Sequence, residues 1–298
     1  MSQIGYITQP EMKYRHSFHA GNFADVHKHV TLLTLLTALK KKDKGFLYLD
    51  THAGRGSYDL SSPSPEAAAG IGRFALAAHT AAELRQYAAL LEQLRSRHGQ
   101  RHMYPGSPLI AANELRSQDR AVLIEVLGAE ARALQASLAA LAQERRDGPR
   151  TVRVERGDGF ERLRAWLPPQ ERRGLTFIDP PYEQTQQDFG HVTAALAEGL
   201  RRFPTGVFAA WYPIKDERST VAWRAACAPA LPAQTLLSEL WLYPRDSRVG
   251  LNGSGVLIAN PPYLTLERMA VWLPQLQACL ALGPAGGSSV RMLSQSSP

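Results

Sequence analysis

Seven short apolar runs, separated by longer amphipathic segments, constrain the fold of this chain more than any other feature. The runs are rich in β-branched and aromatic residues and are bounded by glycine, proline or aspartate, which is typical of strands buried on both faces. Most intervening segments are long enough for a crossover helix, so the pattern predicts an α/β fold with a mainly parallel sheet. The predicted strands are 46–53, 121–127, 151–159, 175–182, 206–213, 236–244 and 255–263.

Two segments interrupt the alternation of strands and helices. Residues 25–40 predict an amphipathic helix that begins at Asp25 as N-cap and places Val26, Val30 and Leu33 on one face. The segment 57–104 is too long for one crossover helix and predicts a small helical insertion. The expected boundaries are a main domain of 1–56 and 105–283 with an N-terminal arm at 1–24, an insertion at 57–104 and a flexible tail at 284–298.

The charge balance points to an anionic partner, with nucleic acid first. The chain of 298 residues has a net charge of +7 and a pI near 9.5. It has no apolar run of about 18 residues that could span a membrane, and its N-terminus lacks the apolar core of a secretory signal. The two cysteines, Cys227 and Cys279, form no metal-like pair, which favours a reducing, cytoplasmic setting.

Acidic residues and glycines gather at the carboxyl ends of the first three predicted strands, where nucleotide-binding α/β folds place their ligands. Asp50 closes the first strand, and Gly54 in the following loop permits a tight turn close to a ligand. Glu125, near the end of the second strand, can accept hydrogen bonds from both hydroxyls of a ribose. Asp158, between two glycines after the third strand, can accept one from the amino group of adenine. Taken singly, each could equally be a turn or a surface acid.

The fourth predicted strand ends in Asp179-Pro180-Pro181-Tyr182, which suits methylation of an amino group on a nucleobase. Such an amine is a poor nucleophile because its lone pair is delocalised into the ring. Acceptors for both N–H groups, here the Asp179 carboxylate and the Pro180 carbonyl, would turn the lone pair toward an electrophilic methyl, and Tyr182 would stack on a flipped base. With the preceding strand ends, this motif predicts a Rossmann-like class I methyltransferase that uses S-adenosylmethionine.

A second motif of the same form, Asn260-Pro261-Pro262-Tyr263, closes the seventh predicted strand. In the seven-stranded, mostly parallel sheet of this fold class, the last strand is inserted antiparallel between the fifth and the sixth. Its carboxyl end should therefore lie at the edge of the sheet opposite the methyl donor. We expect Asn260 to terminate a strand, with Pro261 and Pro262 ending the hydrogen-bond ladder, and Asp179 to carry the chemistry.

Four histidines lie close together between residues 16 and 29. A metal site is one interpretation, but the spacing offers no HxxxH pair and no nearby cysteine, so we expect no metal. A polar arm with hydrogen-bonded histidines is a second interpretation. We favour a third, in which the arm forms the lip of the active site and Tyr14, His16 and Lys28 offer stacking, hydrogen bonding and phosphate contact to RNA.

Several segments together closely resemble the RlmJ family of 23S ribosomal RNA adenine N6-methyltransferases. They include YRHSFHAGNFADVHKH, FLYLDTHAGRGSY, YPGSPLIA, ERGDGF and RRGLTFIDPPYE, and the resemblance spans about residues 12–284. It implies ribosomal RNA as substrate, Asp179 as the catalytic acceptor, and Tyr14 at the substrate with His16 and Lys28 assisting. The ligands of S-adenosylmethionine that it implies are His29, His52, Ser107, Glu125, Asp158 and Gly159.

Two other functions remain open from the sequence. A DNA adenine N6-methyltransferase uses the same motif, although it normally carries a target-recognition domain, and we see no second domain of that size. A non-catalytic RNA-binding protein on a degenerate methyltransferase fold would have lost Asp179 or the donor-binding acids, all of which are present. We expect a monomeric, catalytically active enzyme.

Overall fold

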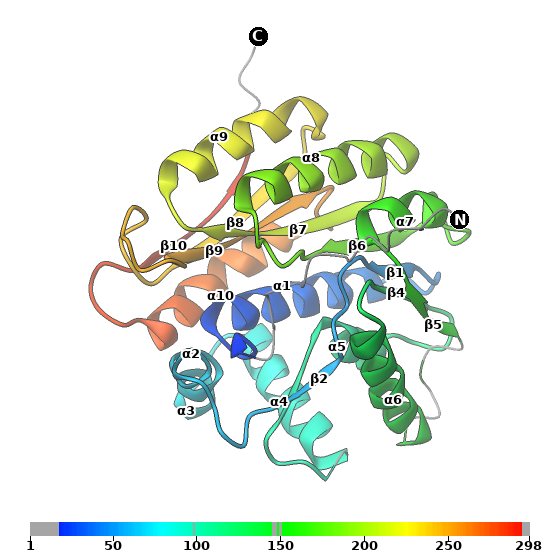
Figure 1. Cartoon of the computed structure of the whole chain (residues 1–298), viewed down its shortest axis with the longest axis horizontal. Coiled ribbons are helices and arrows are strands. Elements are labelled where there is room, and N and C mark those ends of the chain that lie inside the picture. Colours follow the sequence, from blue (N-terminus) through cyan, green and yellow to red (C-terminus); the bar gives the residue numbers. More distant parts are fainter. Residues whose placement is uncertain (1–17, 98, 145–147, 149–150, 294–298) are drawn as a thin grey trace, which may run out of the picture.

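An eight-stranded sheet forms the centre of the molecule, with the strand order β10-β8-β9-β7-β6-β1-β4-β5 (Figure 1). The computed structural model describes residues 18–97, 99–144, 148 and 151–293. Strands β5, β4, β1, β6 and β7 are parallel, and β9 lies antiparallel between β7 and β8. The strands of this sheet are β1 (Leu47–Asp50), β4 (Arg120–Glu125), β5 (Thr151–Arg156), β6 (Gly174–Ile178), β7 (Val207–Ile214), β8 (Thr235–Trp241), β9 (Gly253–Ala259) and β10 (Gly287–Met292).

All seven predicted strands are present, and the predicted antiparallel insertion of the last one between the fifth and the sixth is confirmed. The predicted number of strands and the predicted flexible tail are wrong. Residues 287–292, expected to be flexible, form β10, which pairs antiparallel with β8 from Gly287↔Trp241 to Met292↔Leu236. This strand supplies hydrogen-bond partners to an edge of β8 that would otherwise be open. Its sequence, GSSVRM, is too polar to be recognised as a strand.

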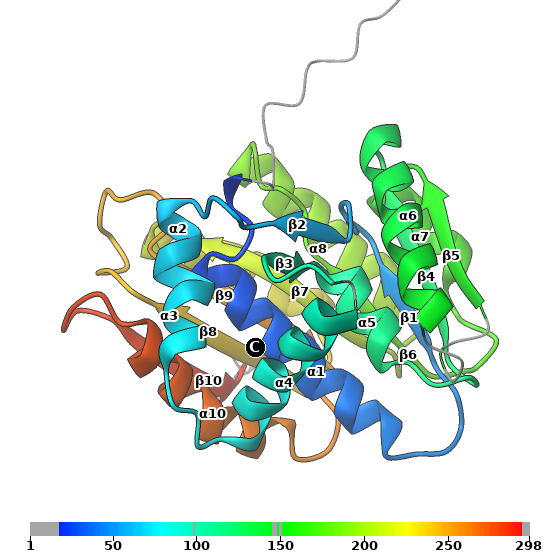
Figure 2. The same ribbon diagram turned by 90° about the horizontal axis from the view of Figure 1, so that it is seen from below.

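Helices cover both faces of the sheet, as Figures 1 and 2 show. Helices α7, α8 and α9 lie on one face, and α1, α5, α6 and α10 lie on the other, where α2, α3 and α4 add an outer layer. The helices are α1 (Phe23–Lys40), α2 (Pro65–Ala67), α3 (Arg73–Leu76), α4 (Ala82–Arg97), α5 (Ser107–Glu114), α6 (Gly128–Glu144), α7 (Gly159–Trp166), α8 (Thr185–Arg202), α9 (Glu217–Cys227) and α10 (Thr265–Leu280).

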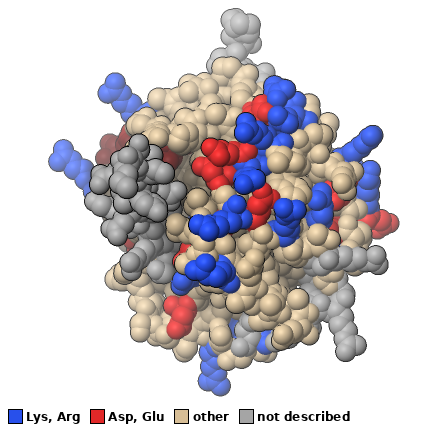
Figure 3. All heavy atoms as spheres, turned by 45° about the vertical axis from the view of Figure 1, so that its right-hand side comes forward, with Lys and Arg blue, Asp and Glu red and all other residues tan. Residues whose placement is uncertain are grey.

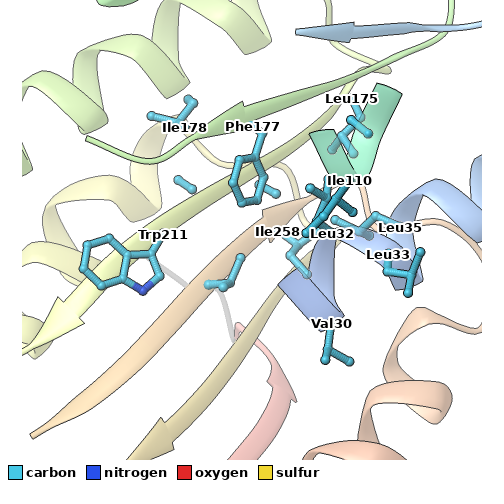
Figure 4. Packing of buried hydrophobic residues seen from close by; sticks show 14 of the residues in the cluster. Val30, Leu32, Leu33, Leu35, Ile110, Leu175, Phe177, Ile178, Trp211 and Ile258 are labelled. Carbon is cyan, nitrogen blue, oxygen red and sulfur yellow. The ribbon is translucent and has the colours of Figure 1, made fainter. Parts of the chain in front are cut away.

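Helix α1 is a core helix rather than an amphipathic surface helix. Fifteen of its 18 residues are buried, because the sheet lies on one side and α4 and α10 on the other. Figure 4 shows Val30, Leu32, Leu33 and Leu35 from this helix among core side chains of the sheet and of α5. The predicted single apolar face is therefore wrong, because a helix that is covered all round needs apolar residues all round.

The N-cap of α1 also differs from the prediction. The cap is Asn22, whose side-chain oxygen accepts from the backbone N–H of Asp25 at 2.9 Å. Asp25 occupies the third helical position, and its Oδ2 accepts from the backbone N–H of Gly21 at 2.9 Å. The pair of contacts resembles a capping box, except that Asp25 accepts from the residue before the cap, and it fixes Asp25 with its second carboxylate oxygen directed to Lys28.

The inserted segment leaves and rejoins the main chain path through a pair of short strands. Strands β2 (Ser57–Asp59) and β3 (Met103–Pro105) pair antiparallel, with Ser57 opposite Pro105. Between them the chain forms α2, a π-helical turn at Ala68–Gly72, α3 and α4, and these helices pack on α1 and α10. The insertion therefore contacts the helix that carries several of the residues implied at the site.

His27 belongs to the core rather than to a polar arm. Its ring is fully buried, with Nδ1 2.9 Å from Ser254 Oγ and Nε2 2.9 Å from Ser238 Oγ. Desolvation of the charged form, only partly offset by Glu239, lowers the pKa of His27 to about 3. The imidazole is therefore neutral in the folded protein at neutral pH, so one of its nitrogens donates to a serine hydroxyl and the other accepts from one.

Replacing His27 by glutamine should reduce the acid sensitivity of the fold. The folded-state pKa lies below the ordinary value of 6.5, so the stability that neutral His27 contributes is complete above pH 6.5 and is lost as the pH falls toward 3. We expect the variant to be less stable than wild type at pH 7, with the difference shrinking by about 2 kcal/mol at pH 5. Urea unfolding of both proteins at the two pH values measures this difference in the free energy of unfolding. A difference that does not change with pH would contradict the buried neutral state of His27.

Candidate active site

A cavity of about 720 Å³ opens at the carboxyl ends of β1, β4, β5 and β6 and collects most of the predicted site residues. Loops after these four strands line it, together with residues from the first two turns of α1, the start of α5, the first turns of α8, and Trp211 on β7. Of the predicted residues, the cavity is lined by Lys28, His29, His52, Gly54, Ser107, Glu125, Asp158, Gly159, Asp179 and Pro180. Tyr14 and His16 lie outside the described residues.

Glu125 is held at the end of β4 by backbone N–H groups. Its Oε2 accepts from Gly54 N at 2.8 Å and its Oε1 from Leu127 N at 2.7 Å. Gly54 has φ +64°, a conformation that favours glycine, and this turn aims its N–H at the carboxylate. Burial raises the pKa of Glu125, and these backbone donors oppose that shift. Each carboxylate oxygen keeps a second lone pair, so Glu125 is oriented to accept from two neighbouring hydroxyls.

Asp158 and Gly159 join the end of β5 to the start of α7. Asp158 is the N-cap, with Oδ1 accepting from Phe160 N at 2.8 Å and from Glu161 N at 3.2 Å. Gly159 lies directly on the loop after β1, because a Cβ at this position would lie 1.9 Å from the carbonyl oxygen of Thr51. Only glycine allows this approach, which brings the third acidic strand end beside the glycine-rich first loop.

Asp50 lies behind the cavity wall and not in it. It is fully buried, and its Oδ2 accepts from the hydroxyls of Tyr48 at 2.8 Å and Ser107 at 2.7 Å. Desolvation raises the pKa of Asp50 to about 6, while those two hydrogen bonds oppose the shift. Asp50, predicted as a cofactor ligand, therefore acts on the cavity through Ser107. Because the Ser107 hydroxyl donates its proton to Asp50, its lone pairs remain as acceptors.

His52 supports the wall between the first and third loops. Its Nδ1 lies 2.8 Å from Thr51 Oγ1, and its ring meets the Phe160 ring edge to face at a centroid distance of 4.7 Å. Desolvation lowers the pKa of His52 to about 4, although Asp158 opposes the shift. His52 is thus a neutral hydrogen-bonding residue at neutral pH.

Lys28 is buried and binds the acid of the first motif instead of facing solvent. Its Nζ lies 2.7 Å from Asp179 Oδ2 and 3.0 Å from Asp25 Oδ1, and only 5 % of the residue is exposed. The same ammonium lies 4.5 Å from the centroid of the Trp211 ring. The expected contact of Lys28 with an RNA phosphate does not fit this placement. Asp25, which the sequence indicated only as a cap, is its second partner. Their spacing of i, i+3 on a helix is the signal that could have identified this pair.

Tyr182 is part of the core, which corrects the expectation that its ring stacks on a base. It has φ +49° and is 3 % exposed. Its hydroxyl donates to the Trp211 carbonyl oxygen at 2.7 Å, and its ring meets those of Trp211 and Phe189 edge to face. The aromatic side chain that lines the cavity beside Asp179 is Trp211. Its position near the end of a buried strand, in the stretch AAWYP, is the sequence signal for it.

Replacing Tyr182 by phenylalanine should lower the free energy of unfolding by about 1–2 kcal/mol, because the buried Trp211 carbonyl would lose its hydrogen bond. We expect turnover to stay within a few-fold of wild type, since the ring is retained below the cavity floor. Urea unfolding and an initial-rate assay measure the two effects. If the ring lay in the cavity instead, its hydroxyl would not be tied to the core and the variant would be as stable as wild type.

The second motif lies at the opposite end of the strands from the cavity, as the sequence predicted. Ala259, at the end of β9, pairs with Phe208 near the start of β7. The Asn260 side chain donates to the carbonyl oxygens of Pro204 at 2.7 Å and Gly206 at 2.8 Å, in the loop that leads into β7. Asn260 thus fixes a loop at the amino end of β7, a full strand length from Asp179.

Within the part of the chain that the structure describes, no three His, Cys, Asp or Glu side chains converge as a metal ion would require. The same residues include no helix long and apolar enough to cross a membrane.

The strand order, with one antiparallel strand between the last two parallel ones and a cavity at the carboxyl ends of the others, defines a Rossmann-like class I methyltransferase fold. Residues 43–293 match the family model described as "Ribosomal RNA large subunit methyltransferase D, RlmJ", and the chain belongs to this family.

Relatives of known name match over nearly the whole chain. Ribosomal RNA large subunit methyltransferase J of Escherichia coli is 39% identical over 283 residues, which cover 94% of this chain and 98% of that protein. The protein of the same name from Haemophilus influenzae is 38% identical over 286 residues, covering 95% and 99%. A crystal structure of a Legionella pneumophila protein is similar with a TM-score of 0.82 at 34% identity, covering 93% of this chain and 99% of that one.

Proposed function

We propose that this protein transfers a methyl group from S-adenosylmethionine to the N6 amino group of an adenine in 23S ribosomal RNA. The observation that carries the proposal is the shared cavity, in which the Asp179-Pro180 acceptor pair lies together with Glu125 and Asp158. A base amine held at the first pair and a nucleoside held at the two acids would meet in one enclosed space. The family and the names of the relatives support ribosomal RNA as the substrate.

The chemistry of the lining residues fits S-adenosylmethionine, which when bound supplies an electrophilic methyl group on a sulfonium. Glu125 would hold the ribose hydroxyls, and Asp158 would accept from the adenine amino group. Val126 and Leu127 line the cavity next to Glu125 and are 45% and 39% exposed, so a flat apolar ring placed there would cover them. At the other end, His29, His52 and Ser107 would meet the amino-acid part of the donor.

Asp179 and the Pro180 carbonyl would accept the two N–H groups of the target amine and so hold its lone pair out of the plane of the base. As the N6–methyl bond formed, the methyl–sulfur bond would break and leave S-adenosylhomocysteine. The nitrogen would then lose a proton, for which the Asp179 carboxylate is the proposed acceptor. The Lys28 ammonium at 2.7 Å stabilises the ionised carboxylate that this role needs. Positioning of amine and donor in line would supply much of the rate.

The charge of the surface supports a polyanionic substrate. The net charge is +7, and on the face drawn in Figure 3 Lys and Arg side chains surround a smaller group of Asp and Glu side chains. Such a surface attracts the phosphate backbone independently of sequence. Tyr14 and His16, close in sequence to Lys28, remain the proposed residues for contact with the target nucleotide.

A methyl-transfer assay separates this proposal from its alternatives. Purified protein and labelled S-adenosylmethionine are incubated with unmodified 23S ribosomal RNA and with DNA, and the products are digested to nucleosides for mass spectrometry. N6-methyladenosine in the RNA alone is the expected result, whereas label in the DNA would indicate a DNA methyltransferase. RNA binding without donor binding in calorimetry would indicate a non-catalytic RNA-binding protein.

A further inference from the structure

Two tyrosine hydroxyls and one imidazole nitrogen form a closed triangle beside the cavity. His29 Nδ1 lies 3.1 Å from the Tyr87 hydroxyl and 3.0 Å from the Tyr104 hydroxyl, and the two hydroxyls are 3.2 Å apart. Both tyrosines are fully buried, and His29 is 4% exposed and lines the cavity. His29 belongs to α1, whereas Tyr87 belongs to α4 and Tyr104 to β3, both in the inserted segment.

The hydrogen count of this triangle selects one tautomer of His29. Among the described residues, the two hydroxyls have their hydrogen-bond partners within the triangle. If Nδ1 is unprotonated, Tyr87 donates to Tyr104 and Tyr104 donates to Nδ1, so both phenolic protons are used. If Nδ1 carried a proton, the triangle would hold three protons and one hydroxyl would have no acceptor, at a cost typical of a buried unpaired donor. Burial raises the pKa of both tyrosines, which keeps both protons in place.

The neutral imidazole therefore carries its proton on Nε2, as a donor on a residue that lines the cavity. Ser107 lines the same cavity as a hydrogen-bond acceptor, because its own hydroxyl proton is donated to Asp50 at 2.7 Å. One donor and one acceptor in this part of the cavity are complementary to an amino-acid zwitterion, with its carboxylate and its ammonium.

We propose that the helical insertion fixes His29 as an Nε2–H donor to the carboxylate of the methionyl part of the methyl donor, with Tyr87 and Tyr104 as positioning residues. This inference rests on the proposed function for the identity of the ligand. It gives the inserted segment a part in donor recognition through two residues that do not themselves line the cavity. The two tyrosines act only through the tautomer of the histidine.

The triangle predicts a specific pattern of coupling between the two tyrosines. Tyr87→Phe leaves the Tyr104 hydroxyl 3.0 Å from Nδ1, and Tyr104→Phe leaves the Tyr87 hydroxyl 3.1 Å from it, so each single variant keeps one donor to Nδ1. We expect each single change to weaken binding of S-adenosylhomocysteine by less than about threefold, and the double variant to weaken it by about tenfold, the size of one charge-assisted hydrogen bond. The loss of binding free energy in the double variant, minus the sum of the losses in the two single variants, measures the role that the two hydroxyls share.

Calorimetry with two ligands separates this role from a general loss of structure. The second ligand is decarboxylated S-adenosylhomocysteine, S-adenosyl-3-thiopropylamine, which lacks only the carboxylate. We expect its affinity to be the same in the double variant and in wild type. Tyr212→Phe is the matched control, since it removes a buried hydroxyl bonded to Glu239 at 2.7 Å, away from the cavity, and should change neither affinity. Equal losses for both ligands in the double variant would overturn the inference.

The tautomer itself can be read without any ligand. In protein labelled with nitrogen-15 histidine, the His29 signals are assigned by their loss in His29→Gln, and we expect an unprotonated Nδ1 and a protonated Nε2 in wild type. The double variant should shift part of the population to the other tautomer. A wild-type protein with its proton on Nδ1 would overturn the inference. A wild-type protein that binds S-adenosylhomocysteine with no measurable affinity would instead overturn the proposed function, whatever the tautomer.

Discussion

Asp179→Asn should lower the rate of methyl transfer by about 10²–10⁴-fold, the range found when a positioned acid or base is removed. The asparagine keeps the shape of the side chain but presents an amide nitrogen that donates, so one acceptor for the target amine and the acceptor for its proton are lost. Donor binding should stay within about twofold, because the ribose and adenine contacts are proposed for Glu125 and Asp158 and not for Asp179. Single-turnover kinetics at saturating RNA and calorimetry with S-adenosylhomocysteine measure the two effects.

Asn260→Ala provides the matched control, since it alters the motif of the same form at the opposite end of the strands. It removes two hydrogen bonds to the loop before β7, to Pro204 and Gly206, and so should cost about 1–2 kcal/mol of stability. The rate of methyl transfer should remain near that of wild type at a temperature where the variant is folded. Near-normal turnover in Asp179→Asn, or a large loss in Asn260→Ala, would place the chemistry elsewhere.

Lys28→Met should lower turnover by about 10²-fold or more with little change in affinity for RNA. The ammonium lies between Asp25 and Asp179, so its loss leaves two carboxylates together in a largely buried site with no cation between them. Methionine keeps the length of the aliphatic stem and lacks only the ammonium group, so the effect should come mainly from the lost charge. A phosphate contact would predict a different result, namely weaker RNA binding and a salt dependence reduced by about one unit of slope. Rates and filter binding at several salt concentrations distinguish the two.

Lys41→Met is the control for net charge, because it removes the same charge from the exposed C-cap of the same helix. Both variants should show the same salt dependence of RNA binding, and only Lys28→Met should lose turnover. A loss of RNA affinity in Lys28→Met that clearly exceeds that of Lys41→Met would restore the interpretation of Lys28 as an RNA contact.

The sequence predicted the sheet well because strand identity depends on local apolar runs, and the antiparallel position of β9 follows from the fold class. It failed for β10, where a polar edge strand is stabilised by a partner about 50 residues earlier, from Gly287 paired with Trp241. For the site, the sequence predicted which residues take part better than it predicted how their side chains are arranged. Ten predicted residues line one cavity, but Tyr182 lies in the core because a positive φ turns its side chain away, and this angle leaves no mark on the sequence.

The contacts of charged residues were the hardest to predict, because their partners are distant along the chain. Lys28 meets Asp179, which is 151 positions away, and a sequence that shows a basic residue near an arm expected to bind RNA gives no sign of that pairing. The triangle of His29, Tyr87 and Tyr104 brings together residues that are up to 75 positions apart. Only the folded arrangement of the insertion against α1 reveals it.

Lys28 and His29 are consecutive residues of α1, and one binds the acid proposed to hold the methyl acceptor while the other lines the space proposed for the methyl donor. Adjacent side chains on a helix diverge by about 100°, so a single turn would position groups for both the donor and the acceptor of the proposed reaction. Burial of that turn among the sheet, α4 and α10 makes it stiff. In the proposed reaction, the line of nitrogen, carbon and sulfur that methyl transfer demands would depend on the internal geometry of one helix, and thermal motion of the surrounding loops would disturb it little.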